Sequence, residues 1–349
     1  MRIGLLGYQQ AGKRTLFTFL TGRTVPDARK PGEVLEGVAR IRDPRVDALA
    51  KICVPERTVY AENHFVLCPD VGTAADAAAG QQRRDWLEAA RRCDLLCFVV
   101  RAFQSDEVFH PIGTVDAARD RSALEAELAL ADMMLIEQRL ERLAREAKGG
   151  RTTAQALEQA GLGKILAALG EEKPISEAGL EPDELEAARK FQLVCLLPRI
   201  WAYNVSEADV ARDFGAGGFA VSARLEREIA ELEDPAERAE YLAAMGLDVS
   251  GLDRMNAAAY SALGLMSFYT IGPDEVRAWT IRRGSHAPTA GGKVHSDIER
   301  GFIRVEVIKY DDLILAGSEK AAKERGKMQV RGRDYVIEDG DICHFLFNV

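Results

Sequence analysis

A glycine-rich loop near the N-terminus separates a short apolar segment, residues 3–6, from an apolar helical segment, residues 16–20. The loop reads Gly-Tyr-Gln-Gln-Ala-Gly-Lys-Arg-Thr over residues 7–15 and follows the pattern G-x-x-x-x-G-K-[ST] up to its last position. In that pattern the glycines let backbone N–H groups surround phosphate oxygens, and the helix N-terminus adds partial positive charge. The loop therefore predicts an α/β nucleotide-binding domain whose phosphate-binding residues are Gln10, Ala11, Gly12, Lys13, Arg14 and Thr15.

The final position of the pattern is changed in a way that bears on metal binding. A serine or threonine hydroxyl ordinarily coordinates Mg²⁺ there, and this chain has Arg14 instead. Thr15 cannot simply take over, because adjacent helical residues point about 100° apart. The loop thus favours nucleotide binding and disfavours ordinary Mg²⁺-dependent hydrolysis. Two interpretations of Arg14 stay open: its guanidinium grips phosphate in place of the cation, or it turns outward and binding is lost.

The charge of the chain is unevenly distributed. The 349 residues carry a net charge of −9, yet residues 270–349 hold 13 basic and 13 acidic side chains and are neutral. Any nucleic-acid contact is therefore expected in the C-terminal part. We expect no leader peptide, because the first residues lead directly into a predicted strand. The sequence has no apolar run of transmembrane length and no C-x-x-C pair. We expect a cytoplasmic protein that contacts no membrane and, lacking a sustained heptad seam, is a monomer.

Apolar runs alternate with helical stretches in a way that is typical of a doubly wound α/β sheet. Residues 95–100 form a continuous apolar run, as expected for a central parallel strand. Further strands are expected at residues 65–68, after Pro198 and at residues 219–222, and helices at residues 83–93 and 225–232.

Residues 119–190 interrupt this alternation and are rich in Ala, Leu, Glu and Arg. Apolar residues recur there at helical spacing, at positions 129, 133, 136, 140, 143 and 147. Gly149 and Gly150 break the pattern, and a second helical stretch, residues 153–169, follows. We expect a helical hairpin that packs on itself and is inserted into the nucleotide domain.

The pattern changes again after residue 272, where short strands dominate. They are expected at residues 276–281, 302–308, 327–330, 335–337 and 344–347. These strands predict a small α+β domain that is separate from the first sheet.

Five segments in the C-terminal third carry a specific family likeness: Ser250–Arg254, Glu275–Arg282, Glu299–Arg304, Asp339–Asp341 and Phe345–Val349. They resemble the YchF-type, Obg-related P-loop NTPases, and the resemblance covers nearly the whole chain. It implies a Ras-like nucleotide domain at residues 1–118 and 191–272, a helical insertion at residues 119–190, and a C-terminal TGS domain of β-grasp, ubiquitin-like fold at residues 273–349. It also implies association with ribosomes and a preference for ATP over GTP.

The resemblance further assigns the residues around the base. The family motif N-x-x-E matches Asn204-Val205-Ser206-Glu207, and the loop that lines the base matches Ser222-Ala223-Arg224. GTPases have N-K-x-D, so Val205 removes the lysine that packs on guanine and Glu207 lengthens the acid by one methylene. The implied base-binding residues are Asn204, Val205, Glu207, Ser222, Ala223 and Arg224, with adenine preferred. A helix-capping turn with a solvated Glu207 is the plainer alternative.

Two more motifs depart from the family where Mg²⁺ or the γ-phosphate is handled. The switch segment Arg29–Glu36 has no threonine or serine, and Asp70 and Gly72 are one residue too close for D-x-x-G. Together with Arg14, these changes leave no ordinary Mg²⁺ ligand, and no catalytic residue or metal ligand is assigned. We therefore expect ATP or GTP to be bound with very slow or no turnover.

Three functions remain open. The first is a weakly hydrolysing nucleotide-binding protein that acts on the ribosome and contacts RNA or ribosomal protein through the TGS cations Arg277, Arg282, Arg283, Lys293, Arg300 and Arg304. The second is a scaffold with a relic loop that docks through the helical insertion and the TGS domain. The third is an active ATPase or GTPase that holds its metal through other residues, such as Asp70. Nucleotide titration separates the second from the others, and a turnover assay separates the third from the first.

Overall fold

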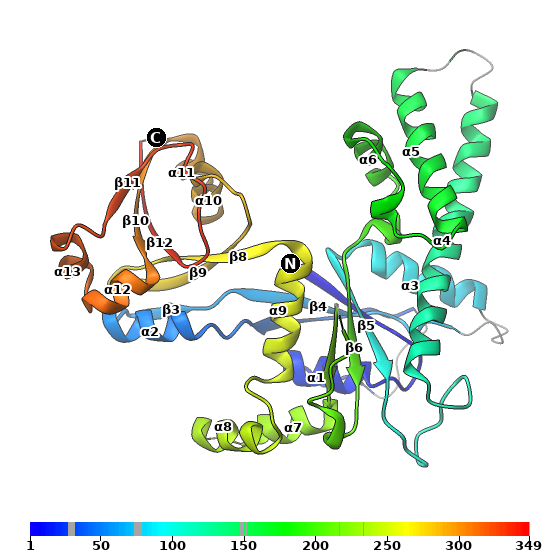
Figure 1. The fold of residues 1–349 in the computed structure, drawn as a ribbon, viewed down its shortest axis with the longest axis horizontal. Coiled ribbons are helices and arrows are strands. Elements are labelled where there is room, and N and C mark those ends of the chain that lie inside the picture. Colours follow the sequence, from blue (N-terminus) through cyan, green and yellow to red (C-terminus); the bar gives the residue numbers. More distant parts are fainter. Residues whose placement is uncertain are drawn as a thin grey trace. The chain divides into compact units, whose positions relative to one another are not determined.

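The computed structural model describes residues 1–26, 32–72, 79–146, 150, 152–215, 217–232 and 234–348. The chain forms two compact units, Met1–Gly37 with His64–Gly251 and Val38–Asn63 with Leu252–Val349. Each unit contains a six-stranded sheet (Figure 1).

The sheet of the first unit has the strand order β2-β4-β1-β5-β6-β7. Its strands are β1 (Arg2–Leu6), β2 (Leu35–Arg40), β4 (Glu62–Leu67), β5 (Leu95–Arg101), β6 (Arg199–Asn204) and β7 (Gly218–Val221). Strand β1 pairs in parallel with β4 and β5, β5 pairs with β6, and β6 pairs with β7. Every residue of β5 is buried, so the predicted central parallel strand is confirmed.

Helices pack against this sheet and bury its aromatic residues. They are α1 (Lys13–Thr21), α3 (Ala79–Arg91), α7 (Ala223–Glu231) and α8 (Pro235–Ala244). The Ser222 hydroxyl caps α7 by accepting from Leu225 N at 3.3 Å, which explains where that helix begins. In the core, the Phe98 ring stacks on Trp201 with centroids 4.8 Å apart, in one cluster with Trp86 of α3.

The helical insertion consists of α4 (Ala117–Glu146), α5 (Thr153–Gly170) and α6 (Pro182–Arg189) (Figure 1). Thr152 and Gln155 form a capping box that begins α5. Ile136 of the predicted stripe packs with Leu162 and Ile165 of α5, so the predicted hairpin is confirmed. Ala147 and Gly149 lie outside the described residues. Short 3-10 turns lie at Ile175–Glu177, Val194–Leu196 and Glu207–Asp209.

The sheet of the second unit is mixed, with the order β11-β10-β12-β8-β9-β3. Its strands are β3 (Arg57–Val59), β8 (Leu265–Thr270), β9 (Glu275–Arg282), β10 (Phe302–Lys309), β11 (Gln329–Arg331) and β12 (Asp341–Phe347). Its helices are α2 (Pro44–Cys53), α9 (Gly251–Leu263), α10 (Ala287–Val294), α11 (Ser296–Arg300), α12 (Tyr310–Ala316) and α13 (Glu319–Glu324). The β8-β9 hairpin, with the last strand β12 parallel to β8 in the middle of the sheet, is the predicted β-grasp arrangement.

Two details of the second unit differ from the sequence prediction. No strand forms at residues 335–337, where Val336 makes only an isolated bridge to His286. Strand β8 was not identified from the sequence, because four consecutive buried residues give it no alternating pattern and Ser267 interrupts its apolar run.

The structure also groups the chain differently from the predicted domain boundaries. Residues 38–63 join the second unit because β3 pairs in parallel with β9. Arg45 forms ion pairs with Asp43 at 3.1 Å and with Asp339 at 3.0 Å, which ties α2 to the C-terminal part. The three-domain division by residue number stays a prediction. None of the helices in the described part of the chain is long and apolar enough to span a membrane.

Candidate nucleotide-binding site

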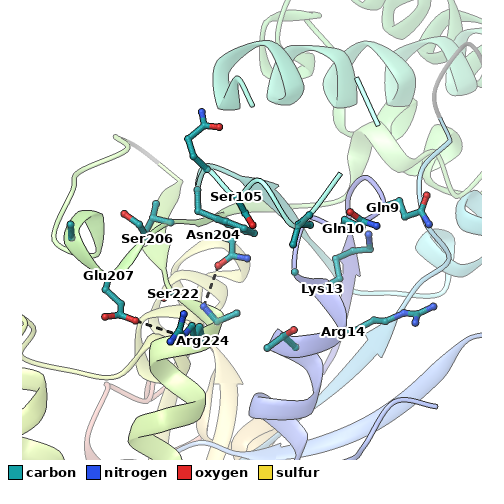
Figure 2. A pocket seen from close by; sticks show the side chains of 18 of the residues that line it. Gln9, Gln10, Lys13, Arg14, Ser105, Asn204, Ser206, Glu207, Ser222 and Arg224 are labelled. Carbon is teal, nitrogen blue, oxygen red and sulfur yellow. Dashed lines mark hydrogen bonds and ion pairs between the residues drawn. The ribbon is translucent and has the colours of Figure 1, made fainter. Parts of the chain in front are cut away.

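A cavity of about 800 Å³ opens in the first unit where β1, β5, β6 and β7 end (Figure 2). Ligands of doubly wound sheets bind at this edge, outside the carboxyl ends of the strands. Eleven of the twelve predicted site residues line the cavity: Gln10, Gly12, Lys13, Arg14, Thr15, Asn204, Val205, Glu207, Ser222, Ala223 and Arg224. The twelfth, Ala11, is buried beside it. The structure therefore brings together segments that lie about 200 residues apart in the chain.

The phosphate loop needs glycine at two positions for steric reasons. Gly7 has φ 141°, and a Cβ there would lie 2.3 Å from Val99 O. Gly12 has φ 100°, and a Cβ there would lie 2.1 Å from Asn204 Nδ2. Helix α1 begins directly after Gly12, and within its described residues no side chain caps it and no acidic residue occupies its first turn. Such a helix N-terminus attracts anions, because its first N–H groups have no partner within the helix.

Lys13 is buried and directed back into the loop. Its Nζ donates to Gly7 O at 2.8 Å and to Tyr8 O at 2.5 Å, and it lies 2.7 Å from Asp70 Oδ1. Burial lowers the pKa of Lys13, and the Asp70 carboxylate opposes that shift. The lysine expected at the outer phosphates is therefore present, and a carboxylate already neutralises it.

Arg14 is exposed and extends away from Glu207 and Arg224 in Figure 2. Within the described residues its guanidinium makes no hydrogen bond or ion pair, although it lines the cavity. The described part of the chain contains no group of three or more His, Cys, Asp or Glu residues that could hold a metal ion. With Arg14 in place of the usual hydroxyl and Asp70 bound to Lys13, these side chains do not fit the ordinary Mg²⁺ site.

The other end of the cavity is formed by the segments after β6 and β7. Asn204 Nδ2 donates to Ala11 O at 3.0 Å, and Asn204 Oδ1 accepts from Ala223 N at 3.2 Å. Glu207 lies 3.9 Å from Arg224, and both side chains are largely exposed (Figure 2). Asn204 thus positions the loops, whereas Glu207 and Arg224 face the open cavity.

Sequence reasoning missed the loop that follows β5, which supplies Phe103, Gln104, Ser105 and Val108 to the cavity wall. The buried Arg101 guanidinium holds this loop by donating to Phe103 O at 3.2 Å, Val108 O at 2.9 Å and Phe109 O at 3.1 Å. Burial lowers the pKa of Arg101. The available signal was a single arginine at the end of an otherwise apolar strand, since such a charge requires internal partners.

The predicted switch segments are only partly described. Residues 29–31 of the first segment and residues 73–78 after the second lie outside the described residues. Asp70 and Gly72 lie inside them, and Val71 N donates to Gly7 O at 3.1 Å beside an isolated bridge between Tyr8 and Val71. This bridge holds Asp70 close to the phosphate loop.

Fold and site together define a P-loop NTPase with a helical insertion and a second unit of β-grasp topology. The family model YchF-GTPase_C, described as "Protein of unknown function (DUF933)", matches residues 265–348. The "Ribosome-binding ATPase YchF" of Haemophilus influenzae is 38% identical over 100% of this chain and 99% of its own length. That of Bacillus subtilis is 36% identical over 99% of both chains.

A solved structure has the same fold along the whole chain. The Schizosaccharomyces pombe YchF GTPase matches with a TM-score of 0.83 and 29% identity, over 99% of this chain and 97% of that one. The chain therefore belongs to the YchF family.

Proposed function

We propose that the chain binds an adenine nucleotide in the cavity around the phosphate loop, hydrolyses it weakly or not at all, and acts on the ribosome. The nucleotide part is carried by one observation: eleven of the twelve expected residues line a single cavity of about 800 Å³. That volume is within the range of pockets that take small ligands. Relatives that match over nearly the whole chain carry the word ATPase in their names.

Positive charge at one end of the cavity supports phosphate binding there. It comes from the first turn of α1 and from the exposed Arg14, whereas the Asp70 carboxylate neutralises the buried Lys13. A guanidinium keeps its charge at every physiological pH and can bind two phosphate oxygens at once. We therefore propose that Arg14 turns towards the phosphates and replaces the divalent cation, so that binding does not require Mg²⁺.

The residues at the other end support adenine. The Glu207 side chain is 44% exposed at the cavity wall, and its carboxylate can accept a hydrogen bond from the adenine amino group. Val205 is buried and cannot supply the lysine that packs on guanine in GTPases. We expect weak or absent hydrolysis, because phosphoryl transfer depends on a positioned divalent cation. Arg14 replaces the hydroxyl that ordinarily holds this cation, and Asp70 is bound to Lys13.

Calorimetric titration of nucleotide-free protein with ATP, ADP and GTP, each in Mg²⁺ and in EDTA, tests the nucleotide proposal. Adenine nucleotides that bind more tightly than GTP, with affinity retained in EDTA, are the expected result. Absence of binding under every condition would leave the scaffold function with a relic loop. A phosphate-release assay on the same samples, with and without ribosomes, tests hydrolysis, and rapid turnover would support the active enzyme instead.

The variant Arg14→Ser tests the role of the guanidinium. It restores the hydroxyl of the ordinary pattern, so we expect weaker binding in EDTA and a newly acquired dependence on Mg²⁺. An exposed cation elsewhere, changed in Lys190→Ser, is the matched control and is expected to bind as the parent does. Binding by Arg14→Ser that is unchanged in EDTA would count against the substitute-cation role.

Exposed cations of the second unit support the ribosome part of the proposal. Residues 320–333 contain six Lys and Arg side chains and one acidic residue, in a chain whose net charge is −9. All six basic side chains are exposed, and in the described residues only Lys327 has a carboxylate partner, Asp312 at 2.9 Å. Ribosomal RNA presents closely spaced phosphates that such a surface attracts.

Co-sedimentation with ribosomes over a range of salt concentrations tests this surface. The double variant Lys320→Glu with Lys323→Glu reverses two exposed charges on α13, so we expect weaker association and a shallower salt dependence. The double variant Lys51→Glu with Lys190→Glu makes the same change of charge elsewhere and is expected to associate normally. Association that is undetectable at low salt for the parent protein would refute the ribosome part.

A further inference from the structure

The ammonium group of Lys13 has no hydrogen left for a ligand. Its three N–H bonds are directed to Gly7 O, Tyr8 O and Asp70 Oδ1, at 2.8, 2.5 and 2.7 Å. Two of these partners are neutral carbonyls of the phosphate loop, whereas Asp70 is a carboxylate. A phosphate oxygen that reaches Lys13 must therefore displace one of these three partners. Asp70 is the partner most easily exchanged, because a phosphate is also an anion and can neutralise Lys13 in its place.

Burial explains why Asp70 occupies this position. The Lys13 side chain is 4% exposed, and a buried ammonium group is costly without a nearby anion. The Asp70 side chain is 35% exposed at the cavity wall, so it reaches Lys13 from the side where a ligand enters. It lies three residues after the end of β4, and the neighbouring Val71–Gly7 hydrogen bond keeps it there.

We propose that Asp70 competes with the nucleotide phosphates for Lys13 and thereby limits nucleotide affinity. The proposal rests on nucleotide binding at this cavity. In an ordinary P-loop protein a divalent cation separates such a carboxylate from the phosphates and is attracted by both. Here Arg14 replaces the hydroxyl that ordinarily holds that cation. The Asp70 charge then faces the phosphates directly and repels them, and binding exchanges one anion for another on Lys13.

If Asp70 is instead a metal ligand, removal of its charge is predicted to change nucleotide affinity in the opposite direction. If its carboxylate holds Mg²⁺ at the phosphates, removal of its charge weakens binding in Mg²⁺. If it competes for Lys13, removal of its charge strengthens binding, and most clearly in EDTA. Asp70→Asn keeps the shape and one oxygen acceptor for Lys13 and removes only the charge.

Titration of Asp70→Asn with ATP in EDTA and in Mg²⁺, beside the parent protein, tests the proposal. Charges a few ångströms apart near a protein surface interact strongly enough that we expect affinity to rise by about tenfold in EDTA. Asp70→Glu retains the carboxylate and is expected to bind within about twofold of the parent. Asp106→Asn removes an exposed charge from the loop after β5 that does not line the cavity, and is expected to change affinity by less than about twofold.

A second measurement guards against loss of the fold. Asp70→Asn leaves Lys13 without its anion, so we expect the free variant to melt at a lower temperature and ATP to raise its melting temperature more than it does for the parent. Affinity of Asp70→Asn in EDTA that equals or falls below the parent value overturns the competitor role while nucleotide binding stands. No binding by the parent or by any Asp70 variant overturns nucleotide binding itself. If Asp70→Asn binds ATP while the parent protein and Asp70→Glu do not, the competitor role is supported.

Discussion

The amide of Asn204 joins two loops that are far apart in the sequence, because its Nδ2 donates to Ala11 O at 3.0 Å while its Oδ1 accepts from Ala223 N at 3.2 Å. The side chain is buried, and both of its polar ends are used inside the protein. Asn204 therefore aligns the phosphate loop with the segment that begins α7. Its amide has no polar end left over, so contacts with the base of a nucleotide are expected from neighbouring groups.

Replacement of Asn204 by alanine is expected to lower the free energy of unfolding by about 1–3 kcal/mol, because Ala223 N and Ala11 O lose buried partners. Nucleotide affinity is expected to fall as well. Urea denaturation and calorimetric titration measure the two effects. Ser206→Ala removes an exposed hydroxyl at the same end of the cavity and is the control, with an expected change in stability below about 0.5 kcal/mol. An Asn204→Ala protein with parental stability would contradict the bridging role.

Alanine at Gly12 is expected to disrupt the site, whereas alanine at Gly22 is tolerated. A Cβ at Gly12 would lie 2.1 Å from Asn204 Nδ2, and φ is 100° there. At Gly22 φ is 66° and nothing lies within 4 Å, so only backbone strain of about 1 kcal/mol is expected. Thermal melts and nucleotide titration compare the two. Equal losses in both variants would show that backbone strain alone, and not the contact with Asn204, makes glycine necessary.

Arg101 is expected to order the loop at residues 102–109. Arg101→Met removes the donor for four carbonyls and is expected to cost about 2–4 kcal/mol in the free energy of unfolding. The loop should then be cleaved faster by protease, and nucleotide affinity should fall, since residues of this loop line the cavity. Arg92→Met breaks an exposed pair with Glu88 and is expected to cost less than about 1 kcal/mol. Unchanged proteolysis of Arg101→Met would refute this role.

The stability of the folded chain is expected to fall at high pH partly because of Tyr8. Burial, with smaller contributions from Asp120 and Glu127, raises the pKa of Tyr8 from 10.0 to about 12. The unfolded chain therefore loses this proton first, so the contribution is full below pH 10 and is lost as the pH approaches 12. Denaturation of the parent protein and of Tyr8→Phe at pH 9 and pH 11 measures it. The parent is expected to lose more stability between the two values, and identical losses would exclude Tyr8 as a source.

Local pattern was sufficient for much of the fold. The glycine loop between residues 3–6 and 16–20, the apolar run at residues 95–100 and the helical stripe with Ile136 each predicted an element that the structure contains. Such patterns succeed because backbone geometry and one-sided burial act over a few neighbouring residues. Strand β8 was missed because burial on both faces removes the alternation and Ser267 interrupts the apolar run, so neither strand pattern is present.

The sequence by itself determined the chemistry available at the site: a phosphate loop, arginine in place of a metal-binding hydroxyl, and glutamate in place of the guanine-reading aspartate. Only the tertiary structure decided how these groups are used. It pairs Lys13 with Asp70 and uses both ends of the Asn204 amide for hydrogen bonds to two loops. It also places the loop after Arg101 at the cavity wall. Those relationships join strand ends that are distant in sequence, and only the parallel packing of the sheet places them a few ångströms apart.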